Sequence, residues 1–177
     1  MLLTEDESIF KLNPIAGRTW SEKGTKPLLI VSGSKEKIFL FGALDQFGNL
    51  QHRRANKQNS DSFIAFLRML LRIYPKIILV IDRAPWHMSR KTKMFLECYK
   101  DRIAIIYLPR YNPESNPTEE CWKQIRANVT TNTLFNSKEE MQKRISEFIG
   151  KNNFNINLCN YLCLLLYLLF SMLSFYP

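Results

Sequence analysis

Two unbroken apolar runs, residues 77–81 and residues 103–108, constrain the fold most strongly. Asp82 directly follows the first run. Runs that do not alternate with polar residues are typical of strands buried on both faces, as at the centre of a parallel sheet. Apolar residues recur at helical spacing over residues 63–74, before the first run, and residues 89–99 between the runs favour another helix. This alternation predicts an α/β fold in which helices pack on a sheet.

The remaining segments extend this pattern. A turn sequence, Asp45-Gln46-Phe47-Gly48-Asn49, predicts a hairpin between two strands. The segment from residue 137 to residue 149 has apolar residues on one side of a helix, at Met141, Ile145, Phe148 and Ile149. We expect the end of a strand at residues 2–4, strands at 28–32 and 37–44, and helices at about 117–129 and 137–149.

The composition is that of a basic globular chain. Its 25 Lys and Arg residues outnumber its 16 Asp and Glu residues, which gives a formal charge of +9. An excess of positive charge favours a polyanionic partner, either nucleic acid or an anionic membrane surface. The four cysteines contain no CxxC pair and only two histidines accompany them, so we expect reduced thiols and neither a zinc site nor a disulfide framework.

Asp82 occupies the position where α/β sheets place their functional groups, the carboxyl end of a central strand. A carboxylate buried there is costly unless a metal or another cation compensates its charge. An exposed aspartate that begins a turn is the competing interpretation, and position alone favours neither. The sequence that follows, Arg83-Ala84-Pro85-Trp86-His87, is distinctive for a plain turn.

Glu119 lies at the third position of a predicted helix that begins with Asn116 as N-cap and Pro117 in the first turn. A glutamate at this position can serve only to cap the helix. However, Glu119 shares the apolar side of the helix with Trp122, whereas Glu120 lies on the opposite, solvated side. The sequence therefore predicts that Glu119 points toward the sheet.

A third group of acids, Glu5-Asp6-Glu7, follows the first strand segment. Alternation along a strand places Asp6 on the face opposite to Glu5 and Glu7. Any of the three could point into a site, and a solvated acidic turn is the plainer alternative.

Three stretches of the sequence resemble the catalytic domain of mariner-superfamily DDE transposases of the IS-six-thirty type. Over roughly residues 1–150 the resemblance rests on matching segments in the same order. The three are Asp6-Glu7-Ser8 followed by Gly17-Arg18-Thr19-Trp20, residues 79–87, and residues 107–122 with the motif Asn116-Pro117-Thr118-Glu119. The strand segment Phe41-Gly42-Ala43-Leu44 also matches.

The resemblance implies an RNase H-like mixed sheet flanked by helices, with Asp6, Asp82 and Glu119 as the catalytic acids and metal ligands. Two Mg²⁺ or Mn²⁺ ions would support DNA strand cleavage and strand transfer during transposition of an insertion sequence. Asp82 and Glu119 are separated by 36 residues, slightly more than is usual in the family. Arg83 stands where many relatives carry Asn, which removes the basis for carrying over a role at this position.

Several further residues are candidates for contacts near the acids or with DNA phosphates. They are His87, Arg83, Arg110, Lys123 and Arg126. For any one of the basic residues, a solvated surface charge is an equally good interpretation, and His87 is as well explained as a hydrogen-bonded structural residue.

The resemblance also implies partners: transposon ends and target DNA, a second copy of the chain in a homodimer, and a cytoplasmic location at the nucleoid. Helix-turn-helix modules usually precede this domain, and we expect an upstream chain to supply them or the copy to be truncated. A catalytically inert remnant is thus the alternative to an active transposase. We assign the catalytic domain to residues 1–150.

Residues 158–176 are nearly all apolar and long enough to span a membrane. A DNA-cutting domain gains nothing from such a span, so we interpret residues 151–177 as a read-through tail. A small membrane-anchored protein is the less favoured alternative.

Overall fold

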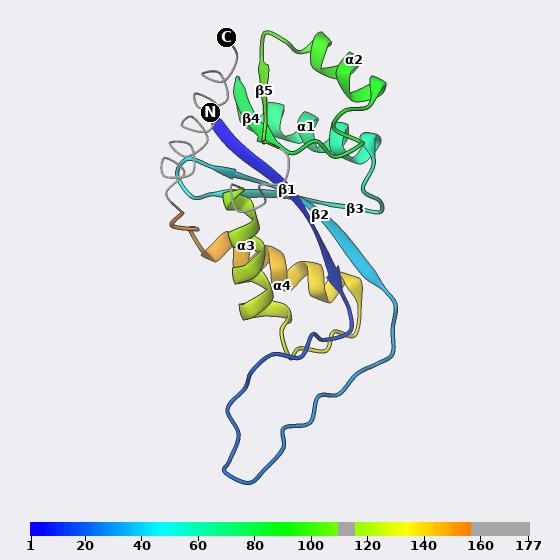
Figure 1. Cartoon of the computed structure of the whole chain (residues 1–177), viewed down its shortest axis with the longest axis vertical. Helices are drawn as coiled ribbons and strands as arrows, with labels where there is room; N and C mark the ends of the chain where they lie inside the picture. The colour runs from blue at the N-terminus through cyan, green and yellow to red at the C-terminus, as the bar shows by residue number, and fades with distance from the viewer. Residues whose placement is uncertain (110–115, 157–177) are drawn as a thin grey trace, which may run out of the picture.

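The computed structural model describes residues 1–109 and 116–156. Five strands form one sheet in the order β3-β2-β1-β4-β5 (Figure 1). The strands are β1 (Leu2–Lys11), β2 (Lys37–Asp45), β3 (Leu50–Ala55), β4 (Ile77–Ile81) and β5 (Ile103–Tyr107). The helices are α1 (Ser60–Ile73), α2 (Arg90–Cys98), α3 (Pro117–Ile125), the π-helical turn η2 (Arg126–Thr130) and α4 (Lys138–Lys151). The predicted alternation of helices and strands is confirmed. The expectation that both apolar runs are buried on both faces was wrong for the second run, because β5 lies at the edge of the sheet and only Ile103 in it is buried.

Strand β1 lies at the centre of the sheet and is longer than predicted. It pairs antiparallel with β2 from Leu3 to Lys11 and parallel with β4 from Leu2 to Thr4. The expectation that the strand ends before the acidic residues was wrong, because buried and exposed positions keep alternating through Ser8, Ile9 and Phe10.

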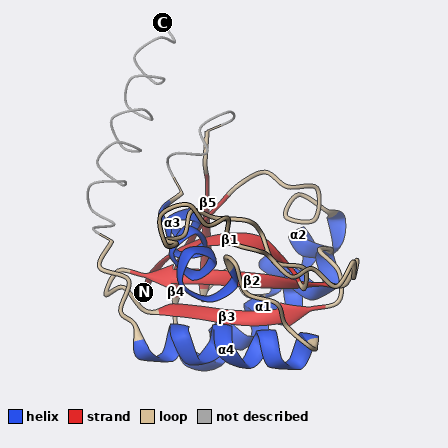
Figure 2. Ribbon diagram, turned by 90° about the horizontal axis from the view of Figure 1, so that it is seen from below, coloured by secondary structure: helices blue, strands red, loops and turns tan. Residues whose placement is uncertain are grey.

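The helices divide between the two faces of the sheet (Figure 2). Helices α1 and α2 cover one face, where Leu3 and Leu79 pack with Phe63 and Phe66. Helices α3 and α4 cover the other, where Phe10 packs with residues of both helices, Trp122 among them. The packed unit includes residues beyond α4, because Phe154 lies buried in this second cluster.

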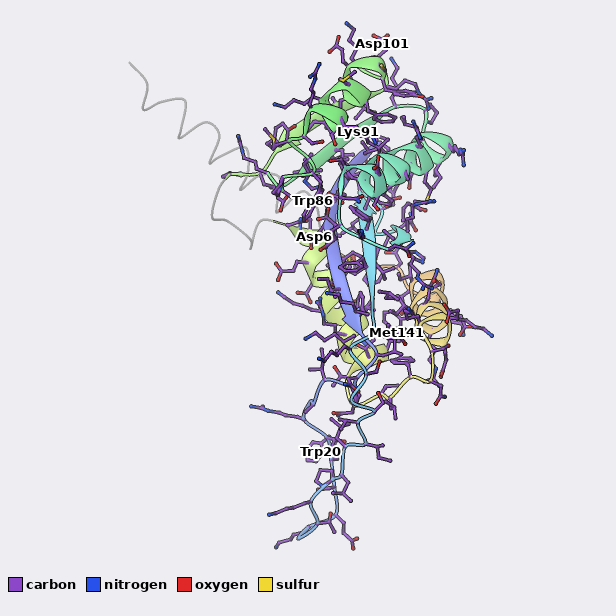
Figure 3. The ribbon with its side chains drawn as sticks, turned by 90° about the vertical axis from the view of Figure 1, so that its right-hand side faces the viewer. Asp6, Trp20, Trp86, Lys91, Asp101 and Met141 are labelled. Carbon is purple, nitrogen blue, oxygen red and sulfur yellow. The ribbon has the colours of Figure 1, made fainter. Side chains whose placement is uncertain are left out.

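Residues 12–36 join β1 to β2 through an extended connection that projects from the sheet (Figures 1 and 3). The strand predicted at 28–32 was wrong: these residues are not in a strand, and Leu28 is 94% exposed. The prediction failed because β1 and β3 already pair with the two sides of β2, so this part of the chain has no adjacent strand edge there. Trp20, near the end of the projection, is 99% exposed.

The predicted helix boundaries are mostly confirmed, since each helix begins at a capping side chain. Asn59, Ser89 and Ser137 each accept a hydrogen bond from a backbone N–H in the first turn of α1, α2 and α4. The helix predicted at 117–129 changes from α to π geometry at Arg126. Within the described ranges no helix is both long and apolar enough to cross a membrane, and residues 158–176 lie outside those ranges.

Candidate active site

Strand pairing brings Asp6 and Asp82 next to each other. Leu2 pairs with Ile78 and Thr4 with Val80 in the parallel register of β1 and β4. Continuing this register by two residues aligns Asp6 with Asp82, which immediately follows the last residue of β4. Because paired residues in neighbouring strands point to the same face, both carboxylates start from one face of the sheet.

Helix α3 brings Glu119 to that face. The Thr118 hydroxyl donates to the backbone oxygen of Thr4 at 2.7 Å, and the two threonine hydroxyls lie 2.8 Å apart. Asn116 caps α3 and also donates from its side chain to the backbone oxygen of Glu5 at 2.9 Å. These hydrogen bonds fix the N-terminus of α3 against β1 immediately before Glu119.

Gly42 makes this close packing possible. It pairs with Asp6 across β1 and β2. A Cβ at this position would lie 2.4 Å from the Trp122 ring, well inside van der Waals contact. The absence of a side chain at Gly42 therefore lets α3 approach the sheet directly beside Asp6.

The electrostatics of Asp6 show that the three acids share one environment. Burial raises the pKa of Asp6 to about 7, and the negative charges of Glu7, Asp82 and Glu119 act in the same direction. Arg126 is near enough for Asp6 and Glu119 to oppose the lowering of its pKa by burial. The acids predicted from the sequence thus surround a region of excess negative charge.

The arrangement of these acids fits hard divalent cations, which prefer carboxylate oxygens. The three carboxylates are nevertheless not in mutual contact: within the described residues, the group of metal-binding side chains whose ligand atoms all lie within 4.8 Å of one another is Glu5, Glu7 and His87. Repulsion between like charges favours this wider separation of Asp6, Asp82 and Glu119, and a bound cation would offset it.

The opposite face of β1 holds a second acidic group. Glu5 is 1% exposed, and neither of its carboxylate oxygens has a hydrogen-bond partner among the residues that the structure describes. Burial and the charge of Glu7 raise the pKa of Glu5 well above its usual value, which favours the neutral acid. Glu7 accepts a hydrogen bond from the indole nitrogen of Trp86, which lies close to β1 in Figure 3.

His87 joins this second group to Asp82. Its Nδ1 lies 2.8 Å from Asp82 Oδ1, and its Nε2 lies 3.2 Å from Glu7 Oε1 and 3.5 Å from Glu5 Oε2. Burial lowers the pKa of His87, but hydrogen bonds to Asp82 and Glu7 and the charges of Glu5 and Glu7 outweigh it and raise the pKa to about 10. The ring is fully buried and lies in contact with Asp82.

Sequence reasoning identified His87 but not its partners Glu5, Glu7 and Trp86. The alternation along β1 separated Glu5 and Glu7 from Asp6 correctly, and that separation could have indicated a second polar group. What the sequence does not show is the turn after β4, in which the His87 N–H donates to the Ala84 oxygen and returns the ring toward β1.

The basic residues proposed from the sequence differ in the groups that they contact. Arg126 donates to the Ser8 hydroxyl, and its guanidinium stacks over Phe10, on the same side of β1 as Asp6. Arg83 lies over the Tyr107 ring just after Asp82. Lys123 forms an exposed ion pair with Glu120 on the solvent side of α3, as predicted for Glu120. Arg110 lies outside the described residues.

Comparisons with known proteins agree with this geometry. Residues 1–142 match the family model of the DDE superfamily endonucleases. The Insertion element IS630 uncharacterized 39 kDa protein of Shigella sonnei is 30% identical over 149 residues, which are 82% of this chain and 43% of that protein. The chain therefore spans less than half the length of this relative.

Solved structures share the fold at low sequence identity. The catalytic domain of the Mos1 mariner transposase aligns with a TM-score of 0.62 and 18% identity, over 90% of this chain and 74% of that one. The Mos1 transposase paired-end complex with the left transposon end aligns with a TM-score of 0.68 and 18% identity, over 89% of this chain and 50% of that one. The predicted RNase H-like fold is confirmed, and the family match over residues 1–142 shows that the chain belongs to the DDE superfamily endonucleases.

Proposed function

We propose that this chain is the catalytic part of an insertion-sequence transposase, which cleaves DNA strands and joins them to target DNA with the help of divalent cations. One observation supports this most strongly: Asp6, Asp82 and Glu119, separated in sequence, extend from β1, the end of β4 and α3 toward one side of the sheet. Membership of the DDE superfamily endonucleases supports the same reaction class.

We propose that Asp6, Asp82 and Glu119 hold two Mg²⁺ or Mn²⁺ ions. Mos1 paired-end complexes have been solved with Mn and with Mg, which supports divalent cations of this kind. Such ions activate an attacking water or hydroxyl and stabilise the leaving oxygen in displacement at phosphorus. The chain's own contribution is to gather carboxylates whose negative charges act on one another and attract a cation, which must displace the proton of Asp6 below about pH 7.

Basic residues around the acids are suited to bind the phosphates of DNA. Arg126 lies closest, since its charge interacts with Asp6 and Glu119. Arg83 and Lys123 are exposed at the end of β4 and on α3. We propose that these residues position the strand, and that Arg110 contributes from the adjoining segment.

The transposon ends and target DNA are the proposed partners, and a homodimer is the proposed assembly. Mos1 has been solved in a paired-end complex with the left transposon end and in a strand transfer complex, which supports DNA as the substrate class. We propose that helix-turn-helix modules from an upstream chain select the ends. The cytoplasmic, nucleoid-associated location and the division at residue 150 stay predictions.

The test is cleavage of DNA that contains the sequences flanking the gene of this chain. The full chain is incubated with labelled DNA and Mg²⁺ or Mn²⁺, with and without an upstream helix-turn-helix chain. Metal-dependent nicks that Asp82→Ala abolishes support the proposal. Cleavage that persists undiminished in this variant contradicts it, and a folded chain that cuts under neither condition identifies an inert remnant. Membrane fractionation with and without residues 157–177 tests the membrane-anchored alternative.

A further inference from the structure

The side chain of Asp82 extends from the very end of β4, where the sheet no longer constrains it. Asp82 is more than half exposed, and its Oδ1 accepts from the Ala84 backbone N–H at 2.8 Å. A metal ligand must present its free oxygen in a defined direction, because ligand geometry sets cation affinity. Some other group has to hold this carboxylate if it is to serve as a ligand.

The His87 ring makes that contact. Its Nδ1 lies 2.8 Å from Asp82 Oδ1, the same oxygen that accepts from the Ala84 N–H, so both donors engage one oxygen, and within the described part of the chain Oδ2 has no hydrogen-bond partner. Hydrogen bonding to His87 is the largest cause of the lowered pKa of Asp82. The contact therefore also favours the charged form that binds cations.

The His87 ring is itself held in place from several sides. Phe63 of α1 packs against it with 4.3 Å between ring centres, and no part of the side chain is exposed. The preceding residue is anchored too, because the Thr92 hydroxyl donates to the Trp86 backbone oxygen at 2.6 Å. A ring fixed in this way can impose its orientation on Asp82.

The far side of the ring faces the acids on the other face of β1. Nε2 lies 3.2 Å from Glu7 Oε1, and that oxygen also accepts from the Trp86 indole. Glu5 Oε2 lies slightly farther away, at 3.5 Å. Both ring nitrogens thus face carboxylate oxygens. Nδ1 is hydrogen-bonded to Asp82, whereas Nε2 has no hydrogen-bond partner among the described residues, so its contact with Glu7 and Glu5 is ionic.

We propose that His87 is a positioning residue that fixes the Asp82 carboxylate for metal binding, and that Glu7 holds its ring from the opposite face of β1. This inference rests on the proposed function, since it gives the acids of one face a role in the site on the other. Glu5 and Glu7 are then not ligands of a second cation but supports of the first site. Partners of this kind typically change metal affinity or activity by about 10- to 100-fold.

Two substitutions at the same position separate the two contacts of the ring. In His87→Asn the amide nitrogen occupies roughly the place of Nδ1, so the donor to Asp82 is kept and the contact with Glu7 is lost. In His87→Gln the amide nitrogen reaches roughly the place of Nε2, so the Asp82 contact is lost. His52→Asn is the matched control, because His52 is a partly buried histidine of β3, two strands away from β1, that contacts the Ser146 hydroxyl of α4.

The measurement is the Mn²⁺ concentration for half-maximal DNA nicking by the full chain, with Mn²⁺ binding followed in parallel by electron paramagnetic resonance. We expect His87→Gln to raise this concentration by about 10- to 100-fold, and His87→Asn to raise it less than about threefold. His52→Asn should leave it unchanged, although it can lower the melting temperature. A purely structural role of His87 would lower the melting temperature in both His87 variants without separating their metal dependence.

Equal metal dependence in His87→Asn and His87→Gln, with Asp82→Asn inactive, would overturn the inference and leave the proposed function intact. Activity retained in Asp82→Asn would overturn the proposed function itself. If both His87 variants fail to fold, Glu7→Gln decides. This variant keeps the Asp82 contact but removes the charge behind the ring, so we expect a small rise of the size expected for His87→Asn. A rise as large as the one expected for His87→Gln, or no rise at all, would overturn the inference.

Discussion

The two faces of β1 carry acids only one residue apart, yet they place these acids in opposite surroundings. Asp6 looks toward α3 and the carboxylates of Asp82 and Glu119, with Arg126 nearby. Glu5 and Glu7 look toward α1 and the buried ring of His87. Both faces raise the pKa of a carboxyl group by burial, but only the Glu5 and Glu7 face supplies a cationic side chain in direct contact.

This difference shows why the carboxyl groups on the two faces are suited to different roles. Where a protein cation lies beside buried carboxylates, it compensates part of their negative charge within the protein. Where carboxylates surround a space without such compensation, a bound ion has the most to contribute. We therefore expect Asp6 to bind metal and Glu7 to hold the ring of His87. Substitutions on each face of β1 can test this.

The largest effect is expected from neutralising the acids on the Asp6 side. Asp6→Asn, Asp82→Asn and Glu119→Gln should each lower the metal-dependent nicking rate by about a thousandfold or more, because each removes a charged ligand of the proposed ions. Circular dichroism should show the fold unchanged. Glu5→Gln is the matched control on the opposite face, and a loss of activity in it as large as in Asp6→Asn would remove the distinction between the faces.

A smaller effect is expected where α3 meets the strand beside Asp6. In Gly42→Ala the new methyl group would overlap the Trp122 ring, so α3 must shift. We expect the free energy of unfolding to fall by about 1–3 kcal/mol, as is usual for overpacking. Urea denaturation measures this change. Gly150→Ala is the control, because a Cβ at Gly150 meets nothing within 4 Å; equal losses in the two variants would contradict the close approach of α3.

The pH dependence of metal binding should further distinguish Asp6 from the acids on the opposite face of β1. Because the pKa of Asp6 is raised to about 7, a cation must displace a proton below that pH. Mn²⁺ affinity should therefore fall by about tenfold per pH unit below 7. Isothermal titration in buffers of different ionisation enthalpy should detect the released proton. Proton release that is unchanged in Asp6→Asn would show that another group titrates.

The same raised pKa of Asp6 determines the direction in which stability changes with pH. The folded metal-free protein holds the Asp6 proton more tightly than the unfolded chain does. Protonated Asp6 therefore contributes to the free energy of unfolding at acidic pH, and this contribution is lost as the pH rises through about 7. Added Mn²⁺ should reduce this loss, which thermal unfolding at pH 5.5 and pH 8 can follow.

The smallest effect is expected from Glu5→Gln itself. The raised pKa of Glu5 favours the neutral acid, which glutamine resembles in size and polarity. The free energy of unfolding should change by less than about 1 kcal/mol at pH 7. Destabilisation by several kcal/mol in urea denaturation would mean that the Glu5 carboxylate is charged and is held by His87.

Local patterns in the sequence predicted most of the fold and the three acids of the site. The apolar run before Asp82 indicated a central strand, and the capping motif before Glu119 indicated the helix that approaches it. The false strand at residues 28–32 shows the limit of such patterns. Apolar, β-branched residues form a strand only where an unpaired strand edge is available, and pairing is a property of the whole sheet.

The support around Asp82 could not be predicted for a related reason. Glu7 and His87 are separated by 79 positions, and their contact depends on the turn that returns His87 toward β1. Periodicity assigns a residue to a face, but it does not say which loop will reach that face. The sequence therefore separated Glu7 from Asp6 correctly without revealing its partner.

The most direct test of the central claim is the position of Mn²⁺ in crystals of the full chain, located by anomalous diffraction. We expect Mn²⁺ peaks within about 2.0–2.6 Å of carboxylate oxygens from Asp6, Asp82 and Glu119, with these side chains closer together around the ions. A peak coordinated by Glu5, Glu7 and His87, with none beside Asp6, would contradict it.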